Sequence, residues 1–246
     1  MIILRSALFN AWFFGTTAVL GFIGLFVRFL APQRALGLAQ LWARLVLDGA
    51  RVLCGITVEV TGTVPTGAAL IASQHQSAFD TLIWVHLAPR VAYVYKAELA
   101  RIPLFGSMLV AAGQIPLDRG ATLATMRNLL RETERAKRDG RQIVIFPEGT
   151  RVPVGVDATI RPGFSLIAAR TGLPVIPVAT DSGRFWGRRA FRKRPGCVHI
   201  RIGEPIPPDL PQAALVNTLK QRWRDAGLTA SPVDKSVDQP APDPAE

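Results

Sequence analysis

From residue 54 onward, short apolar runs alternate with segments of helical periodicity. The runs predict strands at residues 56–61, 68–73, 91–95, 114–117, 142–146, 175–179 and 197–202. The segments between them predict helices at residues 78–87, 104–112, 121–138, 163–171 and 211–226. This alternation favours an α/β domain whose mixed sheet is largely covered by flanking helices.

The N-terminal part of the chain has a different character. Residues 6–27 contain no charged side chain, and Arg5 and Arg28 bound this run. At about 1.5 Å per residue, a helix of this length spans roughly 30 Å, about the thickness of a bilayer core. The apolar part of a signal peptide is shorter, about 7–15 residues. The run predicts an N-terminal membrane helix, or a helical hairpin that enters one leaflet, since Asn10 and three glycines weaken a straight helix.

The flanking charges predict an orientation. One arginine precedes the apolar run, whereas four follow it within residues 28–51. The positive-inside bias therefore places the rest of the chain on the cytoplasmic side of the cytoplasmic (inner) membrane. Residues 35–53 are amphipathic, which suits either an interfacial helix or a helix packed on the domain. We expect membrane-associated helices at 1–53, a main domain at 54–229 and a disordered tail at 230–246.

Charge and cysteine content narrow the class of partner. The formal net charge of +11 favours phosphate, anionic lipid or an acidic protein. The two cysteines, Cys54 and Cys197, do not make a disulfide framework, and no Cys/His cluster has the spacing of a zinc site. We expect no metal, two buried thiols and a reducing compartment.

His75 and Asp80 are the first candidate functional residues. Five residues is a poor spacing on one helix face, but it suits a histidine on a strand-to-helix turn and an aspartate in the first helical turn. Asp80 can then orient one ring nitrogen while the other accepts a proton. In the alternative interpretation, Ser77 and Asp80 only cap the helix.

Four segments follow or flank the ends of predicted strands: residues 75–80, 113–119, 146–151 and 173–179. In open α/β sheets, ligands bind beyond the carboxyl ends of strands, so the first three segments can share one crevice.

These segments resemble the four sequence blocks of the glycerolipid acyltransferase family, which includes 1-acyl-sn-glycerol-3-phosphate acyltransferases. The resemblance covers roughly residues 55–203, and Phe-Pro-Glu-Gly-Thr-Arg at 146–151 is its most specific block. Two positions depart from the family. Gln74 stands where asparagine is common, and residues 114–119 read Gln-Ile-Pro-Leu-Asp-Arg where an aromatic-Ile-Asp-Arg form is common. The second departure puts the fit of the acceptor in question.

The resemblance implies acyl transfer from a thioester, carried by acyl carrier protein or coenzyme A, to the free hydroxyl of a lysophospholipid. Such a reaction needs an activated hydroxyl, and His75 as general base would contribute about 10²–10⁴-fold. Asp80 would stabilise the imidazolium. No cofactor and no acyl-enzyme is required. A serine hydrolase acting through Ser77 stays open, although no Gly-x-Ser-x-Gly elbow occurs in the chain.

The acceptor phosphate needs cations. Arg151 offers a planar fork of donors, Lys96 lies where the family places a phosphate-contacting lysine, and Arg119 is a weaker third candidate. The remaining substrate-binding candidates are Gly149, where backbone can approach a ligand closely, and Glu148 and Thr150 beside it. Glu148 would orient Arg151 or contact the glycerol hydroxyl; the sequence does not decide which.

Residues 184–194 hold six basic and three aromatic side chains. This composition suits a membrane interface or an acidic carrier protein. Stacking on single-stranded nucleic acid is the rival interpretation, and the apolar N-terminal run argues against it.

The leading hypothesis is a membrane acyltransferase that converts lysophosphatidic acid to phosphatidic acid. Two alternatives remain: the same reaction on another lysolipid, such as a lyso-ornithine lipid, and a non-catalytic protein that binds membrane lipid.

Overall fold

The computed structural model describes residues 1–102, 105–118 and 123–228. Within these residues, seven strands form one sheet: β1 (Ile56–Thr61), β2 (Ala69–Ser73), β3 (Val91–Lys96), β4 (Ile115–Leu117), β5 (Gln142–Ile145), β6 (Val175–Thr180) and β7 (Gly196–Ile202). Their order is β1-β7-β6-β2-β5-β3-β4. Neighbouring strands are parallel except for β6 and β7, which are antiparallel. The mixed α/β sheet expected from the sequence is confirmed.

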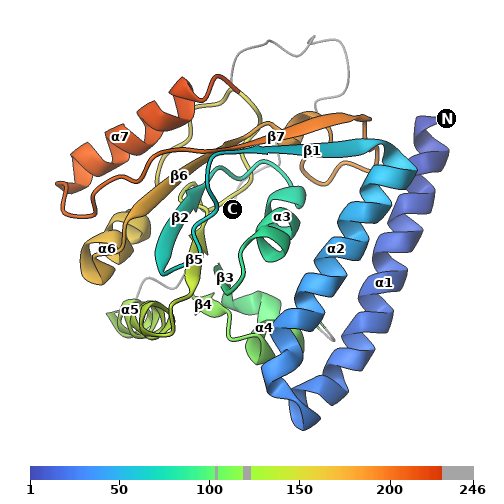
Figure 1. Cartoon of the computed structure of the whole chain (residues 1–246), viewed down its shortest axis with the longest axis horizontal. Helices are drawn as coiled ribbons and strands as arrows, with labels where there is room; N and C mark the ends of the chain where they lie inside the picture. Colours follow the sequence, from blue (N-terminus) through green and yellow to red (C-terminus); the bar gives the residue numbers. More distant parts are fainter. Residues whose placement is uncertain (103–104, 119–122, 229–246) are drawn as a thin grey trace.

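Helices cover both faces of the sheet (Figure 1). They are α3 (Phe79–Leu87), α4 (Phe105–Ala111), α5 (Leu123–Arg138), α6 (Pro162–Thr171) and α7 (Gln212–Asp225), with 3₁₀ turns η2 (Ala97–Arg101) and η3 (Ser182–Arg184). Every residue of β2, β5 and β6 is buried. Their sequences are accordingly apolar except for one polar residue at an end of each strand, rather than alternating.

Two apolar clusters hold the layers together. One joins α3 to the strands, with the fully buried Trp84 and Ile71 among its members. The other joins α5, α6 and α7 to the opposite face, with Phe164, Ile167 and Leu219 fully buried. Because both clusters meet at the central strands, the turns at the strand ends rest on a rigid support.

The N-terminal region is a helical hairpin. Helix α1 (Ile2–Leu30) continues through η1 (Pro32–Arg34) into α2 (Ala35–Cys54), and the two helices lie side by side along one flank (Figure 1). Trp12 Nε1 donates to the Leu45 carbonyl at 2.9 Å, and Trp42 Nε1 donates to Thr17 Oγ1 at 3.0 Å. Helix α2 packs on the domain through Ala43, Val46 and Ala50, which is one of its two expected placements.

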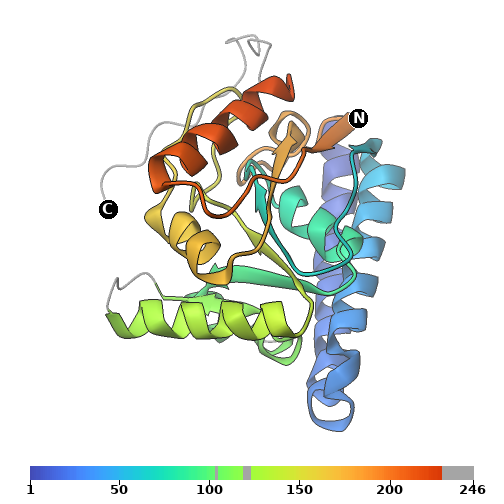
Figure 2. The same ribbon diagram turned by 60° about the vertical axis from the view of Figure 1, so that its left-hand side comes forward.

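Helix α1 is the one helix, among those described, that is long and apolar enough to cross a membrane. Its apolar side chains are largely exposed, including Phe22, Phe26 and Phe29. The closed end of the hairpin extends beyond the α/β body (Figure 2). The predicted tail at 230–246 lies outside the described residues.

Candidate functional site

His75 lies on the turn between β2 and α3, and Asp80 lies in the first turn of α3. His75 Nδ1 is 3.2 Å from Asp80 Oδ2, and the two side chains are 13% and 1% exposed. The carboxylate thus fixes the ring through Nδ1 and leaves Nε2 for the proton transfer expected from the spacing.

The Asp80 carboxylate also organises the turn itself. Its Oδ2 accepts hydrogen bonds from the backbone N–H groups of Gln76 at 2.6 Å and Ser77 at 2.7 Å. Its Oδ1 accepts a hydrogen bond from Ser182 Oγ at 2.5 Å. One carboxylate therefore orients His75 and fixes the turn before α3, whereas no described side chain caps the helix itself. Sequence reasoning missed Ser182, because nothing in the local pattern brings η3 to Asp80.

Ser77 is fully buried, and its Oγ accepts a hydrogen bond from the Phe79 N–H at 3.0 Å. It is not among the described residues that line the cavity around His75. The geometry gives the serine hydrolase interpretation no support.

The block 146–151 forms the wall behind His75. The Phe146 ring stacks on the His75 ring, with centroids 3.9 Å apart and planes 15° apart. Gly149 has φ of +71°, a left-handed conformation that favours glycine, and a Cβ there would lie 3.1 Å from Arg161 Cγ. The Val152 N–H donates to the His75 carbonyl at 2.7 Å, which ties this loop to the turn.

Glu148 is buried beneath the turn. Its Oε2 accepts a hydrogen bond from the His75 backbone N–H at 2.7 Å, a contact that neither sequence-based role anticipated. The pKa of Glu148 is raised to about 8, chiefly by burial; the hydrogen bond from the His75 N–H opposes this rise, and the negative charge of Asp80 adds a smaller contribution to it. The geometry supports a role for Glu148 in positioning the His75 backbone.

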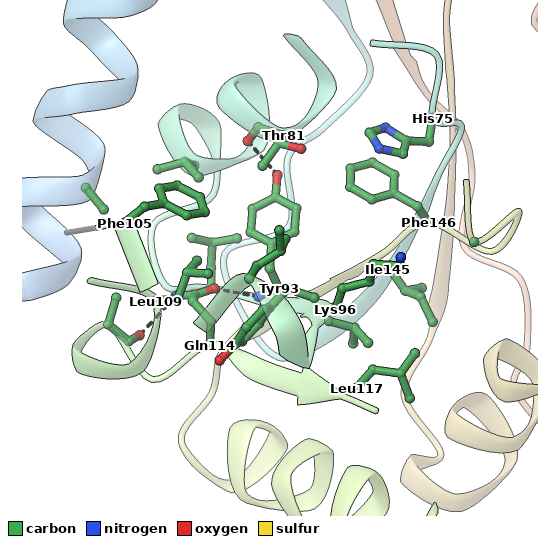
Figure 3. Close-up of a pocket in the computed structure, with 18 of the residues that line it drawn as sticks. His75, Thr81, Tyr93, Lys96, Phe105, Leu109, Gln114, Leu117, Ile145 and Phe146 are labelled. Carbon is green, nitrogen blue, oxygen red and sulfur yellow. Dashed lines mark hydrogen bonds between the residues drawn. The ribbon is translucent and has the colours of Figure 1, made fainter. Parts of the chain in front are cut away.

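A cavity of about 830 Å³ opens at His75. Figure 3 shows His75 and Phe146 on one side, Tyr93 in the middle, and Phe105 and Leu109 on the side toward the N-terminal hairpin. Tyr93 is held there by its hydroxyl, which donates to the Thr81 carbonyl at 2.7 Å. The apolar end is completed by residues of α1 and α2, among them Leu20, Gly21, Ala39 and Trp42.

The other end of the cavity is cationic. Arg151, Arg161, Arg188 and Arg189 line it, together with Gly149 and Thr150. Burial lowers the pKa of Arg151; Asp80 opposes this effect, and the positive charges of Arg188 and Arg189 add to it. Arg189 has φ of +52°, which is uncommon for a residue with a side chain and recurs at functional sites.

Of the other phosphate candidates, Lys96 lines the cavity at the end of β3 (Figure 3), whereas Arg119 lies outside the described residues. Arg188 and Arg189 were expected only at a membrane or carrier surface. Sequence reasoning grouped them with their neighbours by composition and had no means of distinguishing the two side chains that line the cavity.

The two departures from the family pattern have structural partners. Gln74 Oε1 accepts a hydrogen bond from the Thr180 N–H at 3.1 Å, which links the ends of β2 and β6. Gln114 Oε1 accepts a hydrogen bond from the Tyr93 N–H at 2.6 Å, and Gln114 lines the cavity (Figure 3). Gln114 therefore supports the tyrosine that lies midway along the cavity.

Known proteins resemble this chain over most of its length. A 1-acyl-sn-glycerol-3-phosphate acyltransferase of Pseudomonas aeruginosa is 30% identical over 97% of this chain and 96% of that protein. A Helicobacter pylori protein with the same name is 28% identical over 70% of this chain and 73% of that protein. The crystal structure of the 1-acyl-sn-glycerophosphate acyltransferase PlsC from Thermotoga maritima has the same fold, with a TM-score of 0.72 and 21% identity over 94% of this chain and all of that one. The sequence pattern of the acyltransferase family matches residues 55–181, and with the Pseudomonas relative this shows that the chain belongs to the acyltransferase family.

Proposed function

We propose that this protein transfers an acyl group from a thioester to the free hydroxyl of lysophosphatidic acid and so forms phosphatidic acid. The observation that carries the proposal is the cavity, which joins an apolar end, the Asp80-oriented His75 and a cluster of arginines. The apolar end suits an acyl chain, His75 suits the reacting hydroxyl, and the arginines suit the phosphate. The names of the Pseudomonas and Helicobacter relatives support the same reaction.

In the proposed mechanism, His75 Nε2 takes the proton of the acceptor hydroxyl as its oxygen attacks the thioester carbonyl carbon. The C–S bond of the tetrahedral intermediate then breaks, and the leaving thiolate takes the proton back from the imidazolium. Asp80 keeps the ring oriented and stabilises its positive charge between the two steps. Because a thioester is already reactive, no acyl-enzyme on a side chain is needed.

The acceptor phosphate would bind at the cationic end. Arg151, Arg188 and Arg189 lie close enough for their charges to act on one another, so a dianionic phosphate would relieve their mutual repulsion. Lys96, Gly149 and Thr150 line the same cavity and remain substrate-binding candidates. A site so rich in arginine favours an acceptor with an exposed phosphate over a zwitterionic lysolipid.

We further propose that the protein associates with the cytoplasmic face of the inner membrane through a hairpin embedded in one leaflet. A spanning α1 would have to leave its contacts with the domain, among them the Lys193 N–H, which donates to Ser6 Oγ at 2.9 Å. Single cysteines placed across residues 10–30 test this arrangement by their accessibility from each side of a sealed vesicle. Labelling of the two ends of α1 from opposite sides would contradict it.

Acyl transfer by the purified, detergent-solubilised protein tests the reaction. Lysophosphatidic acid and a panel of other lysolipids are offered with acyl carrier protein and coenzyme A thioesters. His75→Ala should lower kcat by about 10²–10⁴-fold, whereas the control His86→Ala, an exposed histidine at the end of α3, should keep full activity. If only another lysolipid is acylated, the proposed acceptor is wrong and the proposed mechanism stands. Lipid binding without any transfer would favour a non-catalytic role.

A further inference from the structure

Three side chains of types that can bind metals lie close together on β1 and β7, at the edge of the sheet opposite β4. Glu59 on β1 and His199 on β7 are register partners, and Cys197 precedes His199 by two residues. Alternation along a strand places all three on one face. One donor atom from each, a carboxylate oxygen, the thiol sulfur and a ring nitrogen, lies within 4.8 Å of the others.

The ring of His199 is already oriented. Its Nδ1 is 2.9 Å from Asp181 Oδ2, and its backbone N–H donates to Asp181 Oδ1 at 2.8 Å. Asp181 is only 5% exposed, so both bonds are shielded from solvent. A carboxylate on one nitrogen of an imidazole holds the tautomer in which the other nitrogen can bind a metal, an arrangement found around most metal-ligating histidines.

A purely structural interpretation explains part of this cluster. β6 and β7 are antiparallel with Thr180 opposite Ile200, so Asp181 and His199 continue the ladder by one position. The register of β1 and β7 likewise places Glu59 beside His199. Backbone geometry therefore explains why these residues are neighbours, whereas their chemistry is a separate observation: all three are donor types that bind zinc. The face is also open, since the apolar cluster beneath α5, α6 and α7 includes no residue of β1 or β7.

We propose that Glu59, Cys197 and His199 bind a thiophilic divalent transition metal, with zinc the best match. Nitrogen, sulfur and carboxylate oxygen are the donors that zinc takes, at about 2.0–2.3 Å. Binding would draw the donor atoms, which lie within 4.8 Å of one another, closer together. Binding deprotonates the Cys197 thiol and releases its proton to solvent. Water completes a tetrahedral shell, so the metal exchanges with solution.

Sequence spacing did not reveal this site, because Glu59 lies on β1, far along the chain from Cys197 and His199 on β7. The expectation that no metal would bind rested on the lack of a cysteine and histidine cluster with the spacing of a zinc site. The site also differs in chemistry from the cavity, where arginines repel a cation.

Cobalt titration of the untagged, full-length protein under reducing conditions tests the proposal. One cobalt ion per chain should bind, with a thiolate-to-cobalt charge-transfer band that equimolar zinc abolishes. Cys197→Ser should remove the band, and His199→Ala should weaken binding at least tenfold. The control Cys54→Ala removes the other cysteine, which is buried, and should leave the band and the affinity unchanged.

Two outcomes would overturn the proposal. One is the lack of a charge-transfer band at stoichiometric cobalt; the other is a band that survives Cys197→Ser. Asp181→Asn keeps a hydrogen-bonding side chain and should weaken cobalt binding by about 10–100-fold. An unchanged affinity in this variant would contradict the role given to Asp181, and far-ultraviolet circular dichroism would report whether each variant folds.

Discussion

At the scale of single residues, Asp80 binds donors through both carboxylate oxygens. Ser182 supplies the donor to Oδ1, while His75 and two backbone N–H groups occupy Oδ2. Ser182→Ala removes a charge-assisted hydrogen bond worth about 1.5–3 kcal/mol. If this hydrogen bond serves to orient Asp80, its removal should lower kcat by about tenfold or more, while KM stays nearly constant. Steady-state kinetics measures both parameters.

A matched control is available in the same molecule. Ser165 is also buried, and its Oγ has no hydrogen-bond partner in the part of the chain described. Ser165→Ala should therefore leave kcat unchanged. Equal losses in the two variants, or a loss expressed only in KM, would exclude a positioning role for Ser182.

Glu148 makes stability depend on pH. Its pKa is raised from 4.5 to about 8 by burial, so between these values the folded protein keeps a proton that the unfolded chain releases. The free energy of unfolding should consequently decrease as pH rises from about 4.5 to about 8, by about 2–4 kcal/mol, and then level off. Glu148→Gln retains an oxygen that accepts the His75 N–H and removes the charge, so it should flatten this slope.

Thermal unfolding in detergent at a series of pH values measures the effect. The control Glu204→Gln changes an exposed acid and should keep the wild-type slope. A Glu148→Gln protein that loses stability with pH as steeply as the wild type would show that Glu148 is not the group responsible.

The sequence predicted His75 and Asp80 because their spacing is local and the turn between them is short. It did not predict Ser182, nor the cavity-lining placement of Arg188 and Arg189. These residues reach the site through β6 and the loop before β7, so their place depends on strand order. The role of Glu148 was also missed, since a buried carboxylate that supports a backbone N–H has no signature in sequence.

At the scale of elements, α1 is attached to the domain by a buried cation. Lys193 Nζ lies 5.1 Å from the Trp186 ring centroid and 5.9 Å from that of Phe9, and it donates to Asn10 Oδ1 at 3.2 Å. Lys193→Met removes these interactions and leaves two backbone carbonyls without their donor. We expect α1 docking to weaken by about 1–3 kcal/mol.

Hydrogen exchange resolves this change along the chain. Amides in the first half of α1 should exchange about tenfold faster in Lys193→Met, with little change in the central strands. Arg192→Met removes a neighbouring charge that is exposed, and it should leave exchange in α1 unchanged. Uniform acceleration across the sheet would mean that Lys193 stabilises the whole fold rather than the hairpin.

The strands and helices of the domain were predictable, because β2, β5 and β6 are mostly apolar and the helices between them carry the helical period. The docking of α1 was not. Its apolar run predicts a membrane helix by length alone, whereas its attachment depends on distant residues such as Lys193 and Met108. A Cβ at Gly24 would lie 2.1 Å from Met108 Sδ, which shows how closely α4 approaches α1.

At the scale of the whole molecule, the hairpin, the strand ends and the loop before β7 enclose one cavity. The hairpin contributes its apolar end, so the depth available to an acyl chain should depend on residues of α2. Ala39→Phe fills part of that end. Each methylene that no longer enters loses about 0.8 kcal/mol of burial, close to a fourfold change in kcat/KM. Long acyl chains should therefore lose more than short ones.

A chain-length series of lysophosphatidic acids and of acyl thioesters measures this selectivity and identifies which of the two chains occupies the apolar end. Leu41→Phe enlarges an exposed residue of the same helix and serves as the control. If Ala39→Phe lowers kcat/KM by the same factor at every chain length, the variant has disturbed the site as a whole and the apolar end does not hold the chain. If kcat/KM falls more steeply with chain length in only one of the two series, the acyl chain of that substrate occupies the end of the cavity formed by the hairpin. The acyl chain of the other substrate then lies elsewhere.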